Sequence, residues 1–298
     1  MKKAFIFSMI SIACGLFAPQ ATAQRFALKA YDEITLNKSM TFSTTLPEVH
    51  HSSNSNSFGL DFGYTFWKKS GNALEANIGL GYSTASASFD IAELSYNYAA
   101  PASADEDGNP YQRYTQLSDL RQKISFGYLN IPIYLQYEYK FVKWLGVYAN
   151  VGVNLSFRIA NSTSSISGTA KTYGVYKEYD QLVIKADYLN DFGLRYLDEA
   201  SKGKADVNGF SASLKCGAGL EFYVAQPVSF VVGVSYNHGF TDVFKGRYNI
   251  STPEEFNSET APVTYTVTGG QQVKALSDYV TKSRPNPLSL HLGVNVRF

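Results

Sequence analysis

Much of the chain alternates strictly between apolar and polar residues, which is the pattern of β-strands that have one oily and one wet face. Residues 288–298 show it most clearly, because every even position is apolar, every odd position is small or polar, and the last residue is Phe298. In a soluble protein such an uncapped strand would invite aggregation. In a closed barrel it would pair with the first strand. Six further segments alternate in the same way, and these are 57–67, 74–82, 129–139, 145–157, 210–224 and 228–236.

The length and the charge distribution of these segments predict strands that cross a membrane. They run for about 10 to 16 residues, and a tilted strand needs about 9–11 residues to cross a bilayer. A Lys or Arg facing lipid at mid-bilayer costs about 2–4 kcal/mol. The charged residues of these segments all lie on the face opposite the oily one, and they are Asp61, Glu75, Glu138, Lys215 and Glu221. The 22 Tyr and 20 Phe residues, many near strand ends, are typical of the aromatic girdles at membrane interfaces.

The connections between the segments predict an up-and-down barrel of eight antiparallel strands. Short connections (68–72, 140–144 and 225–227) alternate with long ones (84–123, 159–208 and 241–286). Outer-membrane barrels have short periplasmic turns and long outer loops. The last strand follows a long connection, so we expect the carboxy-terminus to be periplasmic.

Seven strands are clear from the pattern, but single-chain bacterial barrels have an even number. We therefore expect a first strand within residues 25–46, paired with residues 288–298. Its expected apolar face is weak and comprises Ile34, Leu36, Met40, Phe42 and Leu46. A barrel of ten strands, which would use part of 173–190 or 263–281, is the alternative.

The amino-terminus predicts export. Residues 1–23 combine a basic start, an apolar run and an Ala-Thr-Ala cleavage site, so we interpret them as a signal peptide and residues 24–298 as one outer-membrane β-barrel domain. A lipoprotein signal that uses Cys14 is the less favoured alternative. After cleavage only Cys216 is left, which excludes an intrachain disulfide.

The charge balance argues against nucleic-acid binding. The whole chain has 26 Lys and Arg and 25 Asp and Glu, and the signal peptide holds two of the lysines. The mature chain is therefore nearly neutral, whereas nucleic-acid-binding domains have a basic surplus. No later stretch is long and apolar enough to predict a membrane-spanning helix.

Residues 127–137, Gly-Tyr-Leu-Asn-Ile-Pro-Ile-Tyr-Leu-Gln-Tyr, resemble a strand of the PorT-like outer-membrane β-barrel family of Bacteroidetes. The order of the elements is similar too, since a hairpin precedes this strand and a last strand ends in Phe. The resemblance implies the fold and an outer-membrane location. A role in type IX secretion is linked to one member of that family, and the resemblance does not extend to it. Pro132 lacks an N–H group, so we expect a bulge or a missing hydrogen bond at this position.

The inward face of the barrel predicts a plug. The lumen of eight strands is just wide enough for side chains, and buried charges must be paired. The inward set is Asp61, Glu75, Glu138, Tyr148, Lys215, Glu221, His291 and Arg297. We expect these residues to fill the lumen with hydrogen bonds and ion pairs; a narrow pore lined by the acidic residues is the alternative.

The sequence predicts no catalytic, cofactor-binding or metal-binding residue. His238 has Ser235 and Asp242 near it, which leaves a lipid-modifying enzyme as an alternative, but a girdle histidine is the favoured interpretation. His50 and His51 fall in an expected outer loop, as do Asp105, Glu106 and Asp107, which we expect to be solvated.

We expect the function of the protein to depend on its long outer connections. We expect 161–172 to be a polar loop tip, and 173–184 and 263–267 to extend hairpins above the membrane. Long loops on a rigid barrel commonly bind other molecules. The sequence therefore predicts a non-enzymatic outer-membrane protein that contacts outer-membrane lipids, lipopolysaccharide, a surface ligand or a protein partner of the envelope.

Overall fold

The computed structural model describes residues 25–44, 49–104, 110–160, 162–176, 182–184, 193–203, 207–225, 227–244, 264–266, 272–274, 276 and 280–298. The signal peptide, Cys14, Leu46 and the acidic residues 105–107 lie outside the described residues. In the described part of the chain, no helix is long and apolar enough to cross a membrane.

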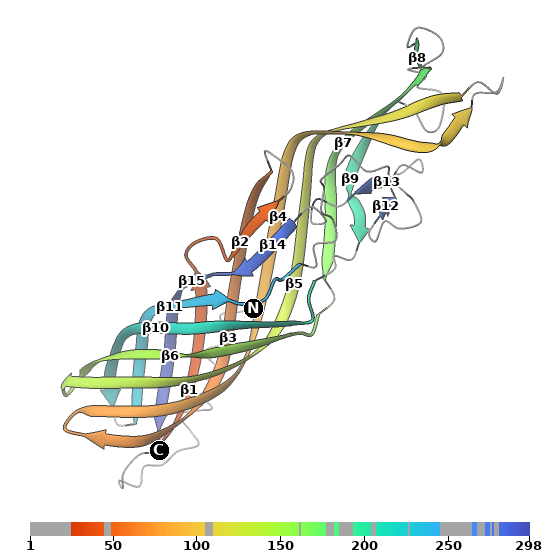
Figure 1. The fold of residues 1–298 in the computed structure, drawn as a ribbon. Helices are drawn as coiled ribbons and strands as arrows, with labels where there is room; N and C mark the ends of the chain where they lie inside the picture. Colours follow the sequence, from red (N-terminus) through yellow and green to blue (C-terminus); the bar gives the residue numbers. More distant parts are fainter. Residues whose placement is uncertain are drawn as a thin grey trace.

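Eight strands form a closed antiparallel barrel (Figure 1). They are β1 (Phe26–Thr35), β3 (His50–Lys69), β4 (Asn72–Ala104), β5 (Pro110–Val142), β6 (Leu145–Arg158), β10 (Phe210–Ala225), β11 (Val228–Gly239) and β15 (Leu288–Arg297). Each strand pairs with the next in this order, and β15 pairs with β1. The prediction of eight strands is confirmed, and the alternative of ten is wrong.

The first and last strands close the barrel as predicted. Ala27 lies opposite Arg297, and Thr35 lies opposite Ser289. At the barrel end that also holds the three short turns, the backbone amide of Phe26 donates to Phe298 O (3.0 Å), and that of Phe298 donates to Phe26 O (2.9 Å). We call this end the short-turn end. Figure 1 shows it at the bottom, where the carboxy-terminus lies.

The first strand lies within residues 25–46 as predicted, but its expected apolar face is partly wrong. β1 ends at Thr35, so Ile34 faces outward on it as predicted, but Leu36 lies beyond it. Met40 and Phe42 belong to a separate strand, β2 (Met40–Thr44), and both are buried. The prediction failed because it joined two strands with different surroundings into one alternating pattern.

Residues 84–123, which we expected to be a loop, mostly continue the two strands on either side. β4 and β5 are each 33 residues long and pair with each other beyond the barrel. In the barrel the inward side of β4 is polar, with Glu75 and Asn77. Past Tyr82 the same side becomes apolar, with Ala87, Phe89 and Ile91, and all of these are buried. This change of the apolar face from outside to inside marks where the strand leaves the lipid-facing belt.

Further strands widen this extension into an outer sheet. β7 (Thr163–Tyr176) pairs with β5, and both β8 (Leu182–Ile184) and β9 (Gly193–Gly203) pair with β7. The predicted loop tip at 161–172 is therefore wrong for most of its length. The expectation that 173–184 and 263–267 extend hairpins is confirmed by β7, by β8 and by the pair of β12 (Thr264–Thr266) with β13 (Gln272–Lys274).

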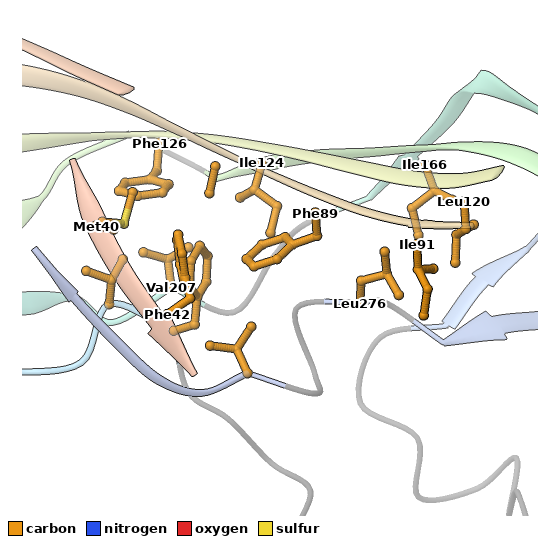
Figure 2. Packing of buried hydrophobic residues seen from close by; sticks show 14 of the residues in the cluster. Met40, Phe42, Phe89, Ile91, Leu120, Ile124, Phe126, Ile166, Val207 and Leu276 are labelled. Atoms are coloured by element: carbon orange, nitrogen blue, oxygen red, sulfur yellow. The ribbon is translucent and has the colours of Figure 1, made fainter. Parts of the chain in front are cut away.

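A small two-stranded lid lies against this outer sheet. It consists of β2 and β14 (Val280–Pro285), which pair with each other and continue the seam between β1 and β15. Phe42 of the lid packs against Phe89 of β4 (ring centroids 5.1 Å apart) and against Phe244 (6.0 Å). Figure 2 shows this apolar cap, in which Met40, Phe42 and Val207 face Phe89, Ile124 and Phe126. The cap lies outside the barrel, and the burial of its apolar side chains holds the outer sheet and the lid together.

The barrel wall carries an apolar belt on its outer face. Ile78, Leu80, Leu135, Val151 and Val234 are each between 46% and 56% exposed, and they alternate with inward polar residues. Burial in lipid is the arrangement that stabilises such a belt.

Pro132 interrupts the ladder between β4 and β5, and the register is unchanged. Paired positions stop at Ile78 and Ile133 and resume at Gly81 and Asn130. On its other side Pro132 keeps its place opposite Asn154 of β6. The expectation of a bulge or a missing hydrogen bond is confirmed in its second form, since pairing is lost at Pro132 and no bulge forms. Gly79 lies opposite the proline ring and leaves room for it within a regular strand.

Candidate functional site

The middle of the lumen holds two ion pairs that both start from β1. Lys29 pairs with Glu75 of β4 and donates to Gln136 Oε1 of β5 (3.0 Å). Lys215 of β10 donates to Glu33 Oε1 (2.9 Å), and His291 Nδ1 lies 3.2 Å from the same oxygen. The four Lys and Glu side chains are at most 7% exposed. These contacts tie strands on opposite sides of the barrel together through its centre.

Tyrosines fill the space around these pairs. Tyr134 donates to Asp61 Oδ2 (2.6 Å), and the Lys215 ammonium lies 5.1 Å from the centre of the Tyr31 ring. The His291 ring stacks on Tyr31 with the centroids 5.6 Å apart. The aromatic faces thus contribute to holding the buried cations.

Arg297 forms a second cluster at the short-turn end. Its guanidinium donates to Glu138 Oε2 and to Glu221 Oε1, both at 2.7 Å. Asn295 Nδ2 also donates to Glu221 Oε1 (3.0 Å). One arginine therefore neutralises the buried Glu221 and the half-buried Glu138 next to the carboxy-terminus.

All eight residues predicted to point into the barrel lie in the lumen: Asp61, Glu75, Glu138, Tyr148, Lys215, Glu221, His291 and Arg297. The predicted network of ion pairs is confirmed for the described residues. The sequence reasoning missed the partners Lys29 and Glu33. Their alternation with Leu28 and Ala30 could have revealed them, but Asp32 on the outward face obscures the pattern.

A cavity of about 100 Å³ lies on the outer side of the ion pairs. Each of the eight barrel strands places at least one Ser, Thr or Asn on its wall. We call this set the hydroxyl–amide ring, and it comprises Thr35, Ser57, Ser83, Asn130, Asn154, Ser213, Asn237 and Ser289. Glu33 and Lys215 form its floor, and Met40 and Pro285 of the lid reach its roof.

The structure separates the residues of the possible Ser-His-acid group. Ser235 is buried on the inner face, whereas His238 is exposed on the outer face of the same strand. The His238 ring lies between Tyr236 (centroids 6.5 Å apart) and Phe240 (5.9 Å). Asp242 accepts from the backbone amide of Ser283 (2.9 Å). A hydroxyl nucleophile and its base need a hydrogen bond, and the contacts of His238 are those of a girdle histidine.

His50 and His51 lie on the outer part of β3 and not in a loop. The His51 ring packs edge-on against Phe42 of the lid (5.2 Å). Burial lowers the pKa of His51, and the nearby Lys38 lowers it further. A neutral imidazole suits a position beside the apolar cap. Among the described residues, no group of three His, Cys, Asp or Glu could hold a metal ion.

A closed antiparallel barrel with an apolar belt outside and paired charges inside defines the class of outer-membrane β-barrel proteins. Comparison with known families agrees: the family described as the outer membrane protein beta-barrel domain matches residues 22–245, and the chain belongs to it. This membership implies the outer membrane of a Gram-negative bacterium. Among curated proteins, no sequence matches the chain.

Several solved outer-membrane proteins are similar to the chain at low identity. The structure of OprG from Pseudomonas aeruginosa is 12% identical, with a TM-score of 0.39 and coverage of 93% of this chain and 96% of that one. Neisserial surface protein A is 12% identical (TM-score 0.33, coverage 92% and 97%). The outer membrane protease OmpT from Escherichia coli is 9% identical (TM-score 0.33, coverage 92% and 94%). At this level of similarity the specific role has to come from the chain itself.

Proposed function

We propose that the protein is a non-enzymatic outer-membrane barrel that uses its outer sheet to bind a partner at the cell surface. The observation that carries this proposal is the continuation of β4 and β5, each 33 residues long, into a sheet that the apolar cap fixes in place. Binding residues on loops and hairpins are most effective when a rigid scaffold positions them. The partner is a surface ligand, lipopolysaccharide or a protein of the envelope.

The orientation follows the rule for bacterial barrels. The short-turn end, with Phe298, faces the periplasm, and the outer sheet faces the medium, because outer-membrane barrels keep short turns inside. Residues 1–23 act as a cleaved signal peptide. Within the family, the strand around Pro132 supports a place among the PorT-like proteins of Bacteroidetes.

The lumen supports a barrel that does not conduct. Lys29, Lys215 and Arg297 each bind a carboxylate from another strand across the interior. A conducting lumen would leave those carboxylates facing water. The separation of Ser235 from His238 supports the absence of a serine-type active site.

Crosslinking in living cells tests the binding role. The full chain is compared with a variant in which residues 92–117, the far end of the β4–β5 hairpin, are replaced by a short turn. Because the cap residues Phe89 and Ile124 are kept, the barrel and the cap should still fold. We expect the full chain to capture a discrete protein or lipopolysaccharide species that the shortened variant does not. Equal capture by both proteins, or by neither, contradicts the proposal.

A separate measurement tests the enzymatic alternative. Lipid A from cells that produce the wild type is compared by mass with lipid A from cells that produce His238→Ala. We expect identical masses. A mass difference that depends on His238 would show that the barrel modifies lipid.

A further inference from the structure

The cavity bounded by the hydroxyl–amide ring exists because the sequence places short side chains around it. An eight-stranded barrel is just wide enough for side chains to fill, and the layer below is filled by long residues such as Lys29, Tyr134 and Arg297. In the hydroxyl–amide ring the inward side chains are short, and each of the eight strands contributes one of them. A single Leu or Tyr in the ring would occupy much of the space, so the cavity depends on all eight strands.

Several polar atoms on the cavity wall lack partners within the described part of the chain. Asn237 Oδ1, Asn154 Oδ1 and Ser39 Oγ are buried and take part in no hydrogen bond there. Ser39 is 2% exposed and Asn237 is 8% exposed. Buried polar groups are almost always hydrogen-bonded. Two of these three atoms are amide oxygens, which only accept, so they require a molecule that donates.

The Lys215 and Glu33 charges on the floor neutralise each other, so the floor favours an uncharged ligand. Lys215 and Glu33 pair with each other (2.9 Å), and Ser57 donates to the other oxygen of Glu33 (3.1 Å). On the wall, Phe126 and Tyr128 add aromatic surface beside the ring. A ligand that carries hydroxyl groups on an apolar carbon chain matches this wall. Its hydroxyls can donate to the acceptors, and its carbon atoms can pack on the aromatic surface.

From this geometry we propose that the hydroxyl–amide ring is a binding site for a small uncharged polyol. A water molecule needs about 10–15 Å³ of such space, and the cavity of about 100 Å³ is large enough for a short carbon chain that carries several hydroxyls. The polyol hydroxyls donate to Asn237 Oδ1 and Asn154 Oδ1, and its carbon face packs against Phe126. Met40 and Pro285 of the lid lie at its outer end.

Nuclear magnetic resonance of the full mature chain in phospholipid nanodiscs tests this site, with glycerol and erythritol as the probes. We expect saturable shifts of the backbone amides of the ring residues. Ser213→Leu fills the cavity from β10 and should weaken binding at least tenfold. Ala212→Leu changes the neighbouring residue, which does not line the cavity, and should bind as the wild type does. If Ser213→Leu does not fold, Ser83→Leu makes the same test from β4.

Three results would overturn the proposal. The first is that no ring amide responds to either polyol. The second is an equal response in Ser213→Leu and the wild type, which would mean an adventitious additive only. The third is a set of water contacts at the ring that neither polyol displaces, which would make the cavity a site for ordered water alone.

Discussion

Lys215 of β10 donates to Glu33 of β1 across the lumen, with 2.9 Å between Nζ and Oε1. The two residues are 182 positions apart, and both are buried. The pair therefore couples the first strand to a strand that is not its neighbour in the barrel. Together with Lys29 and Glu75, it makes the closure of the barrel depend on the correct placement of β1.

Removing one partner of this pair should destabilise the barrel strongly. Lys215→Met leaves the buried Glu33 carboxylate without its ammonium partner, with His291 and the Ser57 hydroxyl beside it, and breaking a buried pair in this way costs about 3–5 kcal/mol. The double variant Glu33→Leu, Lys215→Met removes both charges of this pair and should lose less. The measurement is the free energy of unfolding in urea with the protein in lipid vesicles. A double variant as unstable as the single one would contradict the central role of charge pairing.

Arg297 should contribute strongly to the stability of the barrel, although it lies next to the carboxy-terminus. Arg297→Ala leaves Glu138 and Glu221 without their shared cation and should cost about 3–5 kcal/mol in the free energy of unfolding. Arg284→Ala is the matched control, since Arg284 is 45% exposed in its side chain and lies 4.0 Å from Asp242. Exposed pairs contribute about 0–1 kcal/mol. Similar losses in the two variants would show that the buried cluster contributes little.

Gly79 should tolerate no side chain, because it faces Asp61 and Pro132. A methyl group there would overlap the Asp61 carboxylate and come within 2.9 Å of the proline ring. We expect Gly79→Ala to cost about 1–3 kcal/mol in stability, as overpacking does. Gly209→Ala is the control, because a methyl group at Gly209 meets nothing within 4 Å. Heat-induced unfolding followed by gel mobility compares the two variants, and equal midpoints would argue against the crowded geometry.

The inward and outward faces of most barrel strands could be predicted from the sequence, and the reason is physical. Lipid on one side and a packed lumen on the other force a strict alternation, so a strand such as β15 can be interpreted from its own residues. β1 is harder to recognise because Asp32 interrupts its outward face, while the inward face carries the long aliphatic chain of Lys29 and the aromatic ring of Tyr31.

The outer sheet could not be predicted with the same rule. Beyond Tyr82, strand β4 has water outside and the apolar cap inside, so its apolar residues change sides while the alternation continues. Phe89 and Ile91 then fall on the side that a barrel pattern reserves for polar residues. The pairing of Lys29 with Glu75 and the hydroxyl–amide ring depend on contacts between distant strands, which no local pattern contains.

The apolar cap should stabilise the outer sheet without stabilising the barrel below it. Phe89 is fully buried and contacts Phe42 and Phe244, so Phe89→Ala should cost about 3–5 kcal/mol in the stability of the cap. Phe58→Ala is the control on β3, because Phe58 lies outside the cap and is 54% exposed. Limited proteolysis and hydrogen exchange should show faster cleavage and faster exchange in the outer parts of β4 and β5 for Phe89→Ala, and unchanged protection in the barrel. Loss of protection throughout β4 would mean that the outer sheet and the barrel unfold as one unit, and the cap would then be part of the barrel's own stability.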